Sequence, residues 1–343
     1  MVANNKTMKA WRINSFGIDH LTLEDVPVPS PAGDEILIKV NAVSLNFRDF
    51  AIVQGFYLPD LMPKDLIPVS DTSGTVVQLG SSSSKFREGD QVIVHPFLAV
   101  NPDGSFDHMS AYGGPINGGL AEYMVVKEYA LIKAPANLSG QEASTLPIAA
   151  LTAWFSLTNK MKLKAGDHIL FKGTGGVSLF GIQFAKALGA HPIVITSSDE
   201  KGEKTKEIGA DEFINYKEHE NWEAKVKALT GGKGVDHVLE VVGGKSFNRS
   251  LDAIRERGNI IVVGFLEDQY SELDLMKLLS SRVNITAVSS IGNWDSWAAM
   301  LKAIEDYNIK PIVDSIYNFS DAKDAFKQLN KGVFGKIIIK ISG

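Results

Sequence analysis

The order of apolar and polar positions divides the chain into two parts with different rhythms. In residues 8–133, short runs alternate between apolar and polar residues or are apolar throughout, and Gly, Pro, Ser and Asp separate them. The clearest of these runs are residues 36–45, 73–80, 90–97 and 121–127. Short strands at this spacing indicate a β-rich, partly closed barrel. Between Phe97 and Gly119 the chain is rich in Gly and polar residues, and we interpret that stretch as a surface excursion.

From about residue 153 the pattern changes to strands that alternate with helices. HILFKG (168–173) predicts a strand, and the following segment predicts a helix with Val177, Phe180, Phe184 and Leu188 on one face. Further apolar runs follow at PIVIT, VDHVLEVV, NIIVVGF and NITAVSS. Apolar strands interleaved with helices predict a parallel, doubly wound α/β sheet covered on both faces. Residues 310–341 return to short strands, which we expect to fold back onto the first part.

Length, charge and composition narrow the class of protein. A chain of 343 residues suits two domains, and 44% hydrophobic with 22% charged residues is typical of a globular protein. The net charge of −5, without a basic stripe, argues against nucleic acid as a partner. No apolar run reaches the ~20 residues that span a bilayer. The first residues contain no signal-peptide core, so we expect no membrane association and a cytoplasmic protein.

The chain has no cysteine, which excludes disulfides, thiolate metal sites and a cysteine nucleophile.

The most specific motif is a glycine-rich turn, Gly173-Thr174-Gly175-Gly176-Val177-Ser178, between a predicted strand and a predicted helix. Glycines let the backbone turn tightly and approach a pyrophosphate, and the helix N-terminus offers free N–H groups. The alternative is an ordinary glycine turn. The strand–turn–helix context, followed by a second strand, favours a dinucleotide. The third glycine of the fingerprint is replaced by Ser178, a small residue.

The end of the second strand of this unit predicts which dinucleotide binds. An NAD site carries an acidic residue about 20 residues after the glycines, to bind the ribose hydroxyls. Ser197 stands at that position, and Ser198 and Lys201 could contact a 2′-phosphate. Asp199 could instead act as the acid, and Lys201 could be a solvated lysine. We favour NADPH over NADH.

Motifs along nearly the whole chain resemble the medium-chain dehydrogenase/reductase superfamily, in its zinc-lacking, quinone-oxidoreductase-like branch. They are MKAWRINSFG, SLNFRD, SDTSGTVVQLG, FREGDQVIV, GGLAEYMVV, LPIAALTAW, LKAGDHILFKGTGGVSLFGIQFAKALGA, EIGADEFINY, GGKGVDHVLEVVG and FGKIIIKI. The resemblance implies a GroES-like catalytic domain from residues 1–152 and 291–343, and a Rossmann domain from residues 153–290. It also implies an active site in the cleft and a homodimer joined around residues 284–290.

The resemblance further assigns cofactor contacts. Tyr216 joins Ser197 and Lys201 at the 2′-phosphate, and the pyrophosphate falls on the glycine-rich turn. The predicted cofactor-binding residues are Asn46, Thr152, Gly173, Gly175, Gly176, Val177, Ser197, Ser198, Lys201, Tyr216, Val242 and Phe265.

The positions that hold catalytic zinc in related enzymes read Asn46, Asp71 and Ile148 here. Asn46 and Ile148 are poor or impossible zinc ligands, so we expect no zinc site. The four-cysteine structural lobe of those related enzymes corresponds to residues 97–118 here, which contain no cysteine. Their proton-relay residues are replaced here by Arg48 and Ala51. His95 and His108 could in principle form another metal site with Asp71, although both suit structural roles.

Without a Lewis acid, a conjugated carbonyl such as a quinone or enone is a more suitable small-molecule substrate than a simple ketone or alcohol, because its developing charge is delocalised. We expect Asn46, Arg48 and Tyr57 as hydrogen-bond donors, with Asp71 a possible base. Asn46 and Tyr57 each have a structural alternative, in which Asn46 binds only the nicotinamide and Tyr57 only packs. For Arg48 we expect an ion pair with Asp71. Two other functions stay open, an enoyl or short-chain alcohol/aldehyde oxidoreductase and a non-catalytic NADPH-binding protein.

Overall fold

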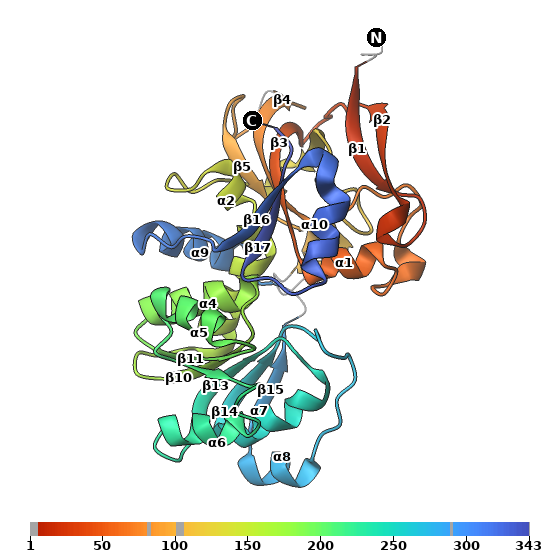
Figure 1. Ribbon diagram of the computed structural model, residues 1–343. Coiled ribbons are helices and arrows are strands. Elements are labelled where there is room, and N and C mark those ends of the chain that lie inside the picture. Colours follow the sequence, from red (N-terminus) through yellow and green to blue (C-terminus); the bar gives the residue numbers. More distant parts are fainter. Residues whose placement is uncertain (1–5, 81–83, 101–105, 289–290, 343) are drawn as a thin grey trace. The chain divides into compact units, whose positions relative to one another are not determined.

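The computed structural model describes residues 6–80, 84–100, 106–288 and 291–342, and the chain forms two compact units (Figure 1). The first unit contains Met1–Ala149 and Ile304–Gly343, and the second contains Ala150–Ala303. The family resemblance implied boundaries at 152/153 and 290/291. The second boundary lies later because most of helix α9 (Trp294–Asp306) belongs to the second unit.

The first unit is built mainly from antiparallel strands. Its strands are β1 (Thr7–Ile13), β2 (Leu21–Pro27), β3 (Glu35–Leu45), β4 (Asp71–Leu79), β5 (Gln91–Val94), β6 (Phe97–Val100), β7 (Phe106–Ala111), β8 (Tyr123–Lys127), β9 (Leu131–Lys133), β16 (Val313–Asn318) and β17 (Lys336–Lys340). The largest sheet has the order β16-β17-β3-β4-β5-β9, and β8 pairs with β3. Its helices are α1 (Phe47–Val53), α2 (Gly140–Ala143) and α10 (Ala322–Leu329). This β-rich architecture confirms the expected class of the first unit.

The register of three strands brings residues distant in sequence to one end of this sheet. Ser44, near the end of β3, lies opposite Asp71, the first residue of β4. On the other side of β3, Leu45 lies opposite Ile337 of β17. Continuing this antiparallel ladder by one step places Lys336 beside Asn46. The strand termini therefore gather polar side chains above an apolar core that includes Ile38, Val43 and Ile339.

The Gly-rich excursion expected at residues 97–119 contains regular structure. Strands β6 and β7 pair in antiparallel fashion, with Phe97 opposite Ala111. Ala111 and Tyr112 are buried, so the stretch is not wholly a surface loop, and that expectation was wrong in this respect. Residues 101–105 within it lie outside the described part of the chain.

The second unit is the parallel α/β sheet that the sequence predicted. Its strands are β10 (His168–Lys172), β11 (His191–Thr196), β12 (Glu212–Asn215), β13 (Val235–Glu240), β14 (Ile254–Val262) and β15 (Asn284–Ala287). They lie in the order β12-β11-β10-β13-β14-β15, and every adjacent pair is parallel. This is the doubly wound order of a Rossmann fold, with the change of direction beside β10.

Helices cover both faces of this sheet, as Figure 1 shows, with α4 and α5 on one face and α6 and α7 on the other. The helices of the unit are α3 (Leu151–Phe155), α4 (Gly176–Ala187), α5 (Asp199–Glu207), α6 (Trp222–Leu229), α7 (Phe247–Ala253), α8 (Leu275–Ser281) and most of α9. Because both faces are covered, the strands are apolar along their length: Ile169, Leu170 and Phe171 of β10 are fully buried. In the described residues, no helix has the length and apolarity to cross a membrane.

Candidate active site

The glycine-rich turn links β10 to α4 with the geometry of an anion-binding loop. Gly173 has φ +78°, a conformation that favours glycine. Gly175 is the N-cap of α4, and no described side chain caps that helix. The first N–H groups of α4 are therefore available to an anion at its positive end.

The space around the turn suits a dinucleotide. A Cβ added at Gly173 or Gly175 would meet no atom within 4 Å. The third glycine of the fingerprint allows the helix to pack closely against the strand. Gly181 has that role here, because a Cβ at this position would collide with the Phe171 ring. Ser178, which replaces that glycine, is buried and donates from Oγ to the Lys172 carbonyl at 3.2 Å. The loop thus fits a bound pyrophosphate.

A buried ion pair lies directly beneath this turn. Lys172, the last residue of β10, donates from Nζ to Oε2 of Glu240 at 2.8 Å, and both side chains are almost wholly excluded from solvent. Ser246 and Ser250 accept further hydrogen bonds from the ammonium, at 2.9 and 3.2 Å. Burial lowers the pKa of Lys172, and the Glu240 carboxylate opposes that shift.

The same carboxylate holds the loop that carries Val242. Oε1 of Glu240 accepts from the backbone N–H groups of Val242 at 2.9 Å and Gly243 at 3.1 Å. The Val242 carbonyl in turn accepts from Glu267 N at 2.8 Å, two residues after Phe265. The structure therefore brings together two of the predicted cofactor-binding residues of the second unit, Val242 and Phe265. Thr152, in α3, is buried.

The predicted 2′-phosphate residues gather at the end of β11. Ser197 directly follows this strand, and Tyr216 N donates to the neighbouring Thr196 carbonyl at 2.9 Å, which places Tyr216 beside it. Ser198 is the N-cap of α5, and its Oγ accepts from Lys201 N. Among the described residues, the Lys201 ammonium has no ion-pair partner.

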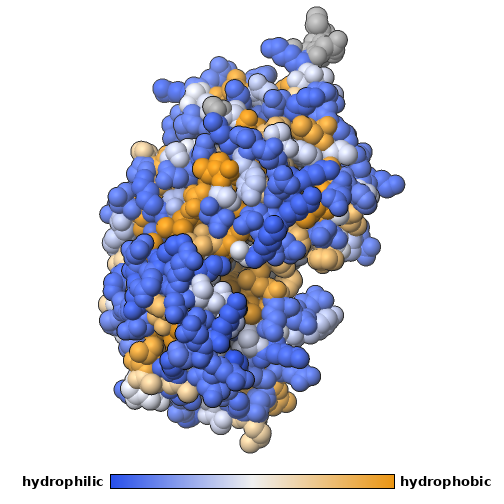
Figure 2. Space-filling view, in the orientation of Figure 1, coloured by the Kyte–Doolittle hydropathy of each residue, from blue (hydrophilic) through white to orange (hydrophobic). Residues whose placement is uncertain are grey.

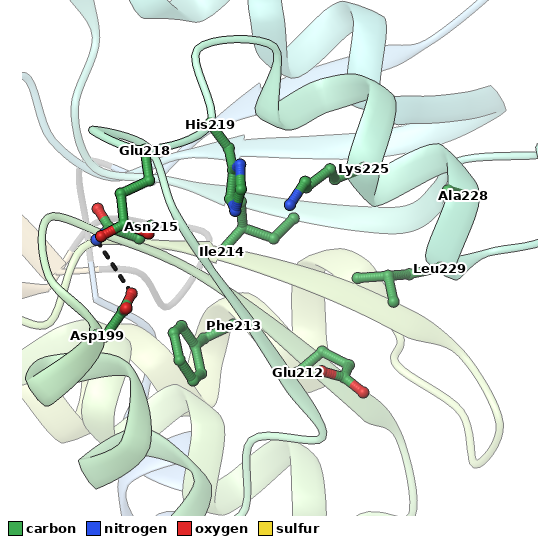
Figure 3. A pocket seen from close by; sticks show the side chains of 10 residues that line it. All are labelled: Asp199, Glu212, Phe213, Ile214, Asn215, Glu218, His219, Lys225, Ala228 and Leu229. Atoms are coloured by element: carbon green, nitrogen blue, oxygen red, sulfur yellow. Dashed lines mark hydrogen bonds between the residues drawn. The ribbon is translucent and has the colours of Figure 1, made fainter.

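Asp199, the alternative ribose-binding acid, is the first residue of α5. Its Oδ1 accepts from Asn215 Nδ2 at 3.1 Å (Figure 3). A surface pocket of about 430 Å³ adjoins this contact, along the edge strand β12 and helix α6, with His219 and Lys225 in its lining. Asp199 is among the residues that line it, whereas Ser197, Lys201, Tyr216 and the glycine-rich turn are not.

In the first unit, a buried polar network connects the ends of β3, β4 and β17. Lys336 Nζ donates to Asn46 Oδ1 at 2.6 Å and to Asp71 Oδ2 at 3.2 Å. Asp71 also accepts from Ser44 Oγ at 3.2 Å and from the backbone N–H of Ile148 at 3.0 Å. Side-chain exposure is 3% for Lys336 and 0% for Asp71, so their charges compensate each other out of water.

The expected ion pair between Arg48 and Asp71 is wrong. Among the described residues, Lys336 is the cation that contacts Asp71. Arg48 instead donates to the backbone carbonyls of Gly114 and Tyr112, the latter at 3.4 Å. The error has a physical reason. Arg48 lies on helix α1, which directs its side chain to the 112–114 turn, whereas the pairing of β17 with β3 places Lys336 next to Asp71.

Arg48 and Tyr57 do come together, as two predicted donors should. The guanidinium lies over the Tyr57 ring, 5.5 Å from its centroid. The neighbouring Asp49 is fully buried and structural: its carboxylate accepts from the backbone N–H groups of Asn46 at 2.8 Å and Ser70 at 3.2 Å. Burial raises the pKa of Asp49.

The three zinc-ligand positions do not offer a zinc donor set. Asn46 Oδ1 is bound to an ammonium, Asp71 is bound by Lys336, Ser44 and a backbone N–H, and Ile148 is apolar. His95 is buried, contacts the backbone of Phe97, and has its pKa lowered to about 3 by burial. No group of three or more metal-ligating side chains occurs in the part of the chain that the structure describes. The His108 side chain lies outside that part.

Sequence reasoning missed Lys336, Lys172 and Glu240. Lys336 stands in the quoted FGKIIIKI motif, and a lysine ahead of three apolar strand residues was the available signal. Its partner Asp71 is 265 residues away, and only the strand register joins them. Lys172 and Glu240 each end an apolar strand of the parallel sheet, the edge where ligands bind in such folds.

Comparison with known proteins defines the class. Residues 32–136 match the family described as "Alcohol dehydrogenase GroES-like domain", and residues 176–306 match "Zinc-binding dehydrogenase". A zinc-type alcohol dehydrogenase-like protein of Schizosaccharomyces pombe is 36% identical, covering 95% of this chain and 96% of the relative. Human quinone oxidoreductase is 30% identical, covering 99% of each.

Solved structures agree with this match. The crystal structure of an NAD-dependent alcohol dehydrogenase superposes with a TM-score of 0.90 at 29% identity, over 98% of this chain and 100% of that one. A mycobacterial protein solved in complex with NADPH superposes with a TM-score of 0.83 at 26% identity, over 97% of this chain and 100% of that one. The chain belongs to the medium-chain dehydrogenase/reductase superfamily. It is an NAD(P)-binding oxidoreductase with alcohol dehydrogenase-like and quinone oxidoreductase-like relatives.

Proposed function

We propose that this protein is an NADPH-dependent, zinc-independent reductase of conjugated carbonyl compounds, such as quinones or enones. The observation that carries the proposal is the contact of Lys336 with Asn46 and Asp71, which commits two former metal-ligand positions to an ammonium ion. The human and plant relatives named as quinone oxidoreductases are consistent with it.

The chemistry follows from what these side chains can do. NADPH, when bound, supplies the hydride. Asn46 Nδ2, which has no hydrogen-bond partner among the described residues, can donate to a carbonyl oxygen. Arg48 donates to carbonyls of the 112–114 turn and lies over the Tyr57 ring. Because the guanidinium contacts the face of the ring, the Tyr57 hydroxyl is available as a second donor. One or two such donors suffice for an acceptor whose charge is delocalised, whereas an alkoxide needs stronger stabilisation.

This function is tested by measuring NADPH oxidation with a panel of quinones and enones, with and without a chelator. We expect turnover at equal rates in both conditions. Activity that disappears with the chelator and returns on adding zinc would contradict the zinc-independent part of the proposal.

The proposed preference for NADPH rests on Ser197, Lys201 and Tyr216 at the end of β11. We expect kcat/KM for NADPH to exceed that for NADH by at least about tenfold, which corresponds to ~1.4 kcal/mol. Lys201→Met should lower kcat/KM with NADPH and leave NADH unaffected, since NADH lacks the 2′-phosphate and serves as the internal control. Equal efficiency of the two cofactors in the wild-type protein would overturn this preference.

We also propose a homodimer formed through the second unit. Strand β15 ends the parallel sheet, and the adjacent helix α8 exposes Leu275, Met276 and Leu279, each by 66% or more. Figure 2 shows hydrophobic atoms at the surface where Figure 1 places α8. A second copy paired along β15 would satisfy the edge strand and bury this apolar face.

Light scattering should therefore give twice the chain mass of 37.2 kDa. Met276→Lys with Leu279→Lys should give the mass of one chain. Leu23→Lys, at an exposed apolar position of the first unit, is the matched control and should stay dimeric. A monomeric wild-type protein would refute the dimer.

A further inference from the structure

The side-chain amide of Asn46 has a hydrogen-bonded oxygen and a nitrogen without a described hydrogen-bond partner. Its Oδ1 accepts from Lys336 Nζ at 2.6 Å. Its Nδ2 is buried and has no hydrogen-bond partner among the described residues. A buried N–H donor without a partner destabilises a protein, because it has lost its hydrogen bond to water without gaining another. Such a group indicates that a ligand supplies the missing acceptor.

Lys336 decides which way this amide faces. An ammonium only donates, so it must face the amide oxygen and leave the NH₂ group on the other side. Without the ammonium, the amide could rotate and present its oxygen to the ligand. Lys336 is itself held by Asp71, which Ser44 Oγ and Ile148 N–H fix in turn. Gly335 permits this placement, because it has φ +103° and a Cβ there would collide with the Ile312 carbonyl.

The ammonium also polarises the amide. The positively charged ammonium that donates to Oδ1 draws electron density from the amide nitrogen and makes its N–H groups stronger donors. Neighbouring hydrogen bonds reinforce one another in this way at low dielectric. The benefit of a stronger donor grows with the negative charge on the acceptor. It is therefore larger for a substrate oxygen that becomes an enolate or a hydroquinone oxyanion than for the neutral carboxamide of nicotinamide.

We propose that Lys336 is a positioning residue that orients and polarises Asn46, so that Asn46 Nδ2 donates to the substrate oxygen on which negative charge develops. This inference rests on the proposed reduction of a conjugated carbonyl and adds to it the source of electrophilic assistance. A fixed lysine, acting through an amide, takes the place of a metal ion.

The test must avoid leaving a buried charge unpaired, because replacing Lys336 alone would leave Asp71 uncompensated and could unfold the protein. The double variant Asp71→Asn with Lys336→Gln removes both charges and keeps hydrogen-bonding groups. Asn46→Ala removes the donor itself. Lys340→Met, on the same strand but only half-buried, is the matched control.

With saturating NADPH and any carbonyl acceptor that the wild-type enzyme reduces, the double variant should lose about 10- to 100-fold in kcat. Its NADPH dissociation constant should be unchanged, and Lys340→Met should behave as wild type. Combining the double variant with Asn46→Ala should give no further loss of kcat beyond that of Asn46→Ala alone, because both changes act through the same donor, Asn46 Nδ2. Additive losses, or weakened NADPH binding with unchanged kcat, would overturn the proposal.

A second readout does not depend on turnover. In the protein alone, the ¹⁵N–¹H signals of the Asn46 side-chain amide should shift in the double variant and move less in Lys336→Arg, which keeps the charge. Unchanged signals would also overturn the proposal. If the wild-type protein reduces no quinone or enone, the proposed function fails while this spectroscopic test still decides the role of Lys336.

Discussion

Replacing Lys172 with methionine should lower the free energy of unfolding by about 3–5 kcal/mol. The lysine neutralises Glu240, whose carboxylate is fully buried beneath the glycine-rich turn. Methionine fills a similar volume but leaves that carboxylate without its cation. Urea denaturation followed by circular dichroism measures the change.

Two comparisons isolate the cause of this loss. Lys172→Met with Glu240→Gln should recover most of the stability, because the glutamine keeps an acceptor for the Val242 and Gly243 N–H groups and carries no charge. Lys186→Met, which breaks a partly exposed pair with Asp211, should cost at most about 1 kcal/mol. A Lys172→Met protein as stable as wild type would show that the buried pair does not stabilise the second unit.

Replacing Gly175 with aspartate should abolish tight NADPH binding while leaving the fold intact. Gly175 has φ −80° and ψ 173°, which any residue can adopt, and its Cβ direction is open. Aspartate is a favourable N-cap, so helix α4 should be unchanged or stabilised by up to about 1 kcal/mol. Its carboxylate would occupy the helix N-terminus, where we expect the pyrophosphate, and would repel it.

We expect the NADPH dissociation constant to rise by at least about 100-fold, equivalent to ~2.7 kcal/mol. NADPH fluorescence titration measures the affinity, and thermal unfolding checks the fold. Gly175→Asn has nearly the same size without the charge and should lose much less affinity. If Gly175→Asp bound NADPH like the wild type, the cofactor would not lie on this turn.

The existence of a parallel sheet was predictable because local pattern identifies most of its strands and the helices between them. Five of its six described strands stand out as apolar runs separated by helical segments, and the turn at Gly173 identifies the ligand edge. Lys336 was not predictable in the same way. It meets Asn46 and Asp71 only because β17 pairs with β3 and β3 with β4, and no local pattern gives that register.

The same limit explains the error at Arg48. Arg48 lies over the Tyr57 ring, a contact that the sequence did not predict, and local pattern could not decide which cation reaches Asp71. The turn that Arg48 binds lies in residues 97–119, a stretch whose composition resembles that of a loop although it forms a paired hairpin. Long-range contacts, rather than local propensity, decide both features.

Whether the protein reduces conjugated carbonyls without a metal is decided by comparing acceptor reduction with alcohol oxidation in one preparation of the protein. Initial rates would be measured for NADPH with a benzoquinone and an enone, and for NADP⁺ with ethanol and a secondary alcohol, all in a chelator. We predict that kcat/KM for the conjugated acceptors exceeds that for the alcohols by at least about 100-fold, because an enzyme that works without a Lewis acid lacks several kcal/mol of alkoxide stabilisation. Comparable turnover of a simple alcohol under these conditions would contradict it.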